Sequence, residues 1–90
     1  MKTAQEFREI AIKEMSTPDM LKAARIIETL ILNAISNSKN YISLNTGYAT
    51  YRDLCDLAKG YDNLKTYLEL HGYVVDTSCF DGSSFLTVSF

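Results

Sequence analysis

The fold is decided at residues 68–75, Leu68-Glu69-Leu70-His71-Gly72-Tyr73-Val74-Val75, where a helical pattern gives way to a strand pattern. Upstream, apolar residues at helical spacing predict a helix that Asp62 caps and Gly72 ends. Downstream, two alternating segments run to Phe90, and Asp81-Gly82 between them has the chemistry of a two-residue hairpin turn. The last third of the chain is therefore predicted to be a helix followed by a β-hairpin.

The middle of the chain predicts a short strand and a short helix. Residues 41–44, Tyr-Ile-Ser-Leu, alternate in polarity as a strand does, and residues 45–49 follow as a loop. Thr50, with Asp53 three residues later, is expected to start a helix that Gly60 ends as a C-cap glycine.

The first third predicts two helices. Thr3 and Glu6 have the spacing of a capping box, and the helix that they open should end before Ser16. Thr17 and Pro18 then start a second helix that runs to about Ser36. Its apolar surface is wider than one stripe, because four further residues extend it: Leu21, Ile26, Leu32 and Ile35. A surface this wide in a small chain indicates self-association through the helix of residues 18–36.

The length predicts one domain, and the order of the predicted elements places it in class α+β with a small antiparallel sheet. Within its 90 residues, we expect an N-terminal helix over 1–16 and an α+β unit over 17–90. The formal net charge of −2 gives no general attraction to nucleic acid or to anionic lipid. The N-terminus has charges where a signal peptide would be apolar, and charges interrupt the longest apolar segment, so we expect a cytoplasmic protein without a membrane span.

From Pro18 onward, the predicted order of helix, strand, helix, helix, strand, strand resembles the winged-helix arrangement. The resemblance implies that the helix of residues 62–71 would be the DNA-reading element. Binding to DNA is dominated by Lys and Arg at the phosphates. Residues 61–90, however, contain Lys65 as their only cation against four carboxylates: Asp62, Glu69, Asp76 and Asp81. Nucleic acid is therefore not the expected partner. The alternative is a DNA-binding regulator that uses Lys22, Arg25 and Lys39.

The residues that might carry catalysis predict no enzyme, cofactor or metal site. His71 is the only histidine and falls at a helix end, where a capping role is the simpler interpretation. Cys55 and Cys79 lie far apart in the sequence without paired ligands and are interpreted as two buried thiols in a reducing cytoplasm. Asp53 and Asp56 share a helical face, which is more typical of a solvated surface than of a cation site.

The segment from Tyr41 to Arg52 is the candidate binding site. Tyr beside Ser, Asn, Thr and Gly is the composition of recognition loops, because the ring supplies contact area at low entropic cost. A base could stack on such a ring, and Arg52 or the N–H groups of the following helix could take a phosphate. The predicted ligand-binding residues are Tyr41, Asn45, Thr46, Tyr48, Tyr51 and Arg52, and Tyr48 is the one most expected to face a partner. The alternative is that most of these tyrosines are half-buried core residues.

The layout also resembles the small accessory proteins of tailed bacteriophages. The resemblance lies in a long apolar helix and in a closing hairpin with Gly-Tyr-Val at 72–74, Asp81-Gly82, and Leu-Thr-Val-Ser-Phe at 86–90. It implies a non-enzymatic protein that acts in the host cytoplasm as a homo-oligomer. Such a protein would sequester or mask a host component, either a nucleotide signal of host defence or a host protein.

Overall fold

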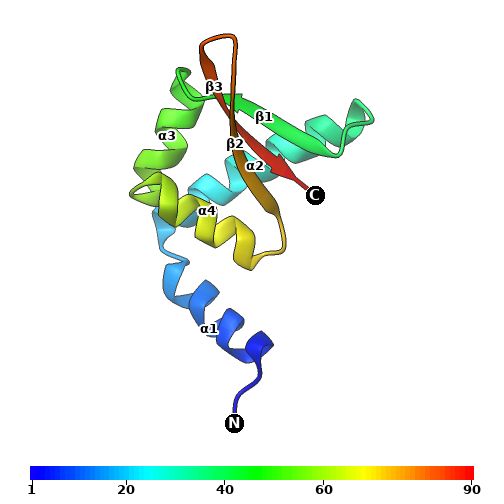
Figure 1. The fold of residues 1–90 in the computed structure, drawn as a ribbon. Coiled ribbons are helices and arrows are strands. Elements are labelled where there is room, and N and C mark those ends of the chain that lie inside the picture. Colours follow the sequence, from blue (N-terminus) through cyan, green and yellow to red (C-terminus); the bar gives the residue numbers. More distant parts are fainter.

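The computed structural model describes residues 1–90, with the side chains of every residue except Phe80. The chain forms four helices and a three-stranded sheet (Figure 1). In chain order the elements are α1 (Ala4–Met15), α2 (Pro18–Ser36), β1 (Tyr41–Asn45), α3 (Ala49–Ala58), α4 (Tyr61–Leu70), β2 (Val74–Phe80) and β3 (Ser83–Ser89). This is the predicted α+β class, and the element order from α2 onward is the winged-helix-like order expected from the sequence.

The starts of α1 and α2 follow the predicted capping chemistry. The Thr3 hydroxyl accepts from the Glu6 N–H at 3.2 Å, and the Glu6 carboxylate accepts from the Thr3 N–H at 3.4 Å. At α2, the Thr17 hydroxyl accepts from the Met20 N–H at 3.1 Å, and Pro18 occupies the first turn. Each cap satisfies an N–H group that has no partner within the helix.

The starts of α3 and α4 differ from the prediction. Tyr48, not Thr50, is the N-cap of α3, and its side chain makes no capping bond. Gly60, not Asp62, is the N-cap of α4, and Asp62 lies within the first turn. Before α3, the Asn45 carbonyl accepts from the Tyr48 N–H at 3.0 Å, and this turn brings the chain into the helix at Tyr48. Before α4, the joint is tight: Lys59 takes the left-handed conformation (φ 61°), and Gly60 follows at φ 125°. Lys59 is therefore the C-cap of α3, which the sequence had assigned to Gly60.

The sheet is antiparallel throughout, and its strand order is β1-β3-β2. The last strand is thus the central one. Ile42, Val88 and Val75 stand side by side across the three strands and are all buried. The β2–β3 connection is the predicted two-residue turn, with Asp81 at φ 52° and Gly82 at φ 80°.

The core lies between α2, α3, α4 and one face of the sheet. Its largest fully buried side chains are Ile27, Leu54, Leu64, Leu86 and Val88. Helix α1 contributes no buried residue and extends away from the sheet beside α4 (Figure 1). Ile12 and Met15 of α1 pack against the core, whereas Phe7 and Ile10 are exposed. The molecule is accordingly a compact body with a helical arm.

Candidate functional site

The structure divides the predicted tyrosine segment between the two ends of β1. Tyr41 begins the strand and Asn45 ends it, so Tyr41 lies apart from the other candidates. At the Asn45 end, the strand and the start of α3 enclose a cavity of about 290 Å³, which we call the loop pocket. Its walls are Ser43, Leu44, Asn45, Tyr48, Thr50, Tyr51 and Phe85. Three of the six predicted residues, Asn45, Tyr48 and Tyr51, therefore come together.

The other predicted residues do not line the loop pocket. Thr46 has a structural role, because its backbone N–H and its hydroxyl both donate to the Ser84 carbonyl, at 3.0 and 3.3 Å. Arg52 is exposed on α3, outside the pocket walls. Tyr41 instead lines a separate hollow beside the end of α2.

Some polar groups of the loop pocket are hydrogen-bonded within the protein, and others have no side-chain partner. The Asn45 side-chain oxygen accepts from the Gly47 N–H at 2.8 Å, which fixes the turn before α3. The Tyr48 side chain is 69% exposed. Because the N-cap makes no side-chain bond, the first N–H groups of α3 have no side-chain acceptor.

Tyr51 forms the inner wall of the loop pocket and is half-buried. Burial is the main reason that the pKa of its phenol is raised from 10.0 to about 12. A hydrogen bond with Cys55 raises the pKa further, as does electrostatic repulsion from Cys55 and Tyr61. The Tyr51 hydroxyl therefore stays protonated at neutral pH. It supplies a neutral ring and hydroxyl to a ligand and no charge.

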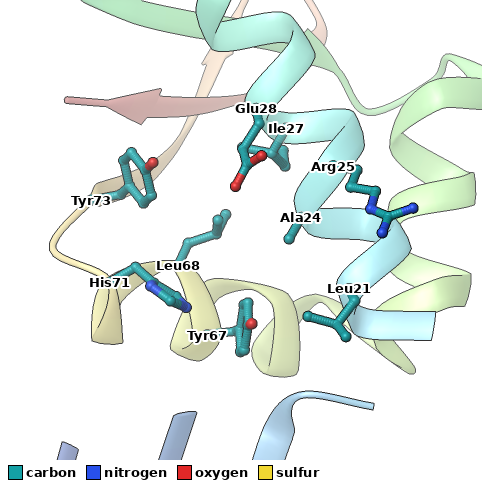
Figure 2. A pocket seen from close by; sticks show the side chains of 9 residues that line it. All are labelled: Leu21, Ala24, Arg25, Ile27, Glu28, Tyr67, Leu68, His71 and Tyr73. Carbon is teal, nitrogen blue, oxygen red and sulfur yellow. The ribbon is translucent and has the colours of Figure 1, made fainter. Parts of the chain in front are cut away.

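A second cavity, which the sequence did not predict, lies between α2 and α4. This α2–α4 groove has a volume of about 350 Å³ (Figure 2). It is lined by Leu21, Ala24, Arg25, Ile27 and Glu28 of α2, Tyr67 and Leu68 of α4, and His71 and Tyr73 of the following turn. Two features of the sequence could have indicated this groove: the wide apolar surface of α2, and the pair His71 and Tyr73 on either side of Gly72.

The floor of the α2–α4 groove is apolar and its rim is charged. Figure 2 shows the Glu28 carboxylate directed into the groove and the Arg25 guanidinium directed away from it. The His71 ring contacts the edge of Tyr67, with ring centroids 4.8 Å apart. Tyr67 is buried, and its hydroxyl lies 3.1 Å from the Ser16 hydroxyl at the α1–α2 joint. The groove thus offers one carboxylate and one imidazole above an apolar base, which suits binding.

The charged residues that bear on DNA binding are arranged as follows. Asp62 and Glu69 are exposed on α4, and Lys65 is half-buried. Asp76 and Asp81 are exposed on the β2–β3 hairpin. The alternative basic set is exposed but spread out, because Lys22 and Arg25 lie in the first half of α2 and Lys39 follows its end. A phosphate backbone that approached α4 and the hairpin would meet mostly carboxylates.

Both cysteines are free thiols. The prediction that both are buried was wrong: Cys55 is only half-buried next to Tyr51, and Cys79 is exposed because it lies on the β2–β3 hairpin. The Cys79 sulfur lies 3.4 Å from the Ser84 hydroxyl. Over the part of the chain that the structure describes, no group of three or more His, Cys, Asp or Glu residues is placed to hold a metal ion. Asp53 and Asp56 are exposed on α3.

Comparisons with protein-family models, with curated proteins and with solved structures found no match to this chain. Among the described residues, none of the helices combines the length and the apolar character that crossing a bilayer requires.

Proposed function

We propose that this chain is a non-enzymatic binding protein that holds a small aromatic, anionic ligand such as a nucleotide at the loop pocket. The observation that carries the proposal is the Tyr48 ring, 69% exposed at the mouth of a cavity whose inner wall is the neutral Tyr51. A large exposed ring beside a hollow is available for stacking, and each stacked base contributes about 1–3 kcal/mol.

The chemistry around Tyr48 suits the anionic part of such a ligand. The first turn of α3 begins at Ala49 and has no side-chain cap, so its N–H groups lack a side-chain acceptor at the positive end of the helix dipole. Thr50, in the same turn, adds a hydroxyl to the pocket wall. The volume of about 290 Å³ lies near the lower end for small-molecule sites, which fits one nucleotide base with its sugar.

Thermal unfolding in the presence of linear and cyclic nucleotides tests the proposal. A ligand at a hundredfold excess over its Kd should stabilise the protein by about 2.7 kcal/mol. Tyr48→Ala should weaken binding by roughly fivefold to a hundredfold, the equivalent of one lost stacking contact. Tyr41→Ala is the matched control, because Tyr41 is an exposed tyrosine of the same segment that lies outside the pocket. Equal losses in both variants, or no nucleotide response in the unaltered protein, would contradict the proposal.

The biological setting that we propose is a tailed-bacteriophage accessory protein that sequesters or masks a host component as a homo-oligomer. Its support is the sequence resemblance together with the apolar residues that α2 leaves exposed: Leu21, Leu32 and Ile35. If the target is a host protein, the tagged chain should recover it from bacterial lysate, and Tyr48→Ala should reduce that recovery.

A second candidate function is a DNA-binding regulator, which the winged-helix-like element order and the strand order β1-β3-β2 favour. It would have to use Lys22, Arg25 and Lys39, since α4 and the hairpin are acidic. Mobility shift on random duplex DNA at several salt concentrations distinguishes the two functions. Affinity that falls steeply with salt indicates released counterions and would support DNA binding. We expect no shift at physiological salt.

A further inference from the structure

Helix α2 carries an exposed stripe with the spacing of a coiled-coil seam. Counted along the helix, Leu21, Arg25, Glu28, Leu32 and Ile35 are separated by four, three, four and three residues, and all five are exposed. That spacing is the heptad pattern in which two helices pack along a common seam. The core of the molecule uses a different face of α2, formed by Met20, Ala23, Ile27, Ile31 and Ala34. The stripe, which we call the α2 seam, is therefore free for a partner.

The order of residues along the seam is self-complementary when one copy is reversed. An antiparallel α2 that places Leu21 opposite Leu32 also places Arg25 opposite Glu28, and Pro18 opposite Ile35. By symmetry each contact occurs twice, as in an isologous interface. We propose that a second copy of this chain docks on the α2 seam in this antiparallel register.

Charge complementarity selects both the partner and the direction. In the antiparallel register, two Arg–Glu pairs lie at the centre and two Leu–Leu layers flank them. A parallel pair in register would instead set Arg25 against Arg25 and Glu28 against Glu28, and like charges across a seam are destabilising. From Pro18 to Ile35 the contact extends about 26 Å at the helical rise of 1.5 Å per residue.

The docked copy would also border the α2–α4 groove. Leu21, Arg25 and Glu28 belong both to the seam and to the groove lining. A helix on the seam would therefore lie along the open side of the groove, with Leu32 of the second copy next to its Leu21. This inference rests on the self-association that forms part of the proposed function, and it specifies which residues form the interface and in which register they pair.

Charge exchange at the centre of the seam tests the register. Arg25→Glu leaves two acidic residues at the centre of the seam in each copy, and Glu28→Arg leaves two basic ones. Like charges then face each other, so each variant alone should dimerise at least about tenfold more weakly than the unaltered protein. An equimolar mixture of the two should form heterodimers, because each acidic centre then faces a basic one. Arg25→Glu combined with Glu28→Arg should dimerise like the unaltered protein. Arg52→Glu, at an exposed cation of α3 away from the seam, is the matched control and should leave dimerisation unchanged.

Sedimentation velocity over a range of concentrations measures the unaltered protein and the five other samples, and far-UV circular dichroism confirms that each is folded. Recovery of the dimer in the mixture supports the antiparallel seam. A monomeric unaltered protein would overturn the inference, as would single variants that dimerise normally or a mixture that stays monomeric. Nucleotide-induced thermal shifts, recorded on the same samples, report on the loop pocket separately, so failure of the seam and failure of the ligand site can be told apart.

Discussion

At the scale of single residues, the tyrosines show how position, not residue type, sets a role. Tyr67 is 4% exposed and anchors α4 through its hydroxyl, Tyr51 is half-buried beside a thiol, and Tyr48 is 69% exposed. The Ser16 hydroxyl donates its one proton to the Ile12 carbonyl at 2.6 Å, so Tyr67 must be the donor in the Tyr67–Ser16 bond. Tyr48 is the most exposed of these three, and unlike the exposed Tyr41 it borders the loop pocket.

The raised pKa of Tyr51 predicts a change in stability at alkaline pH. Its pKa is about 12 in the folded protein and near 10.0 when unfolded, so the protonated phenol favours the folded state. This contribution is complete below pH 10 and is lost as pH rises through 12. Urea unfolding at pH 9 and at pH 11 should therefore show a smaller pH-dependent loss for Tyr51→Phe than for the unaltered protein. Equal losses would show that the phenol is not shielded.

At the scale of elements, the β2–β3 turn is held by backbone conformation. Both turn residues have positive φ, which is the geometry that favours Asp-Gly in a two-residue hairpin.

Gly82→Ala should destabilise the fold by about 1 kcal/mol, because a side chain at φ 80° is strained. A methyl group at this position meets no atom within 4 Å, so the expected loss comes from the backbone alone. Ser83→Ala in the same hairpin is the control. Chemical denaturation measures both variants, and a neutral Gly82→Ala would contradict the assigned turn.

Features set by a few neighbouring residues could be predicted from the sequence. The capping box at Thr3, the cap at Thr17 and the Asp81-Gly82 turn each depend on atoms within four residues, and all are present. The helix start at Thr50 was wrong because the turn at Asn45 brings the chain into α3 at Tyr48. The start at Asp62 was wrong because the joint at Lys59 and Gly60 begins α4 earlier. At both places the conformation of the preceding turn, and not the capping preference of Thr50 or Asp62, sets where the helix starts.

The candidate site was only partly predictable for a related reason. Whether a residue lines a pocket depends on the end of the strand at which it lies and on residues far away in the sequence. Tyr41 and Tyr48 look equivalent in the sequence, yet β1 separates them, and Phe85 of the last strand completes the loop pocket. The α2–α4 groove is lined by residues more than forty positions apart in the sequence, such as Leu21 and Leu68. A periodic pattern contains no such information.

At the scale of the whole molecule, stability is concentrated in the body and not in the α1 arm. Ile27 of α2 is 1% exposed at the centre of the core, whereas Phe7 of α1 is 56% exposed.

Truncation of these two residues should therefore have very different costs. Ile27→Ala should lower the free energy of unfolding by about 2–5 kcal/mol, because it leaves a cavity in close-packed surroundings. Phe7→Ala should change it by no more than about 0.5 kcal/mol. Equilibrium urea unfolding at low protein concentration measures both. A large loss for Phe7→Ala would show that the arm folds back onto the body.

The central position of β3 has a consequence for biosynthesis. This strand follows the other two in the sequence, yet both of them pair only with it, so β1 has no neighbour in the sheet until β3 has been made. On the ribosome, α2, β1 and α3 emerge before the strand that closes the sheet, so their apolar faces remain uncovered until β3 has left the exit tunnel. The sheet is therefore expected to form only once β3 has emerged, and the uncovered apolar surface is exposed to aggregation in the interval.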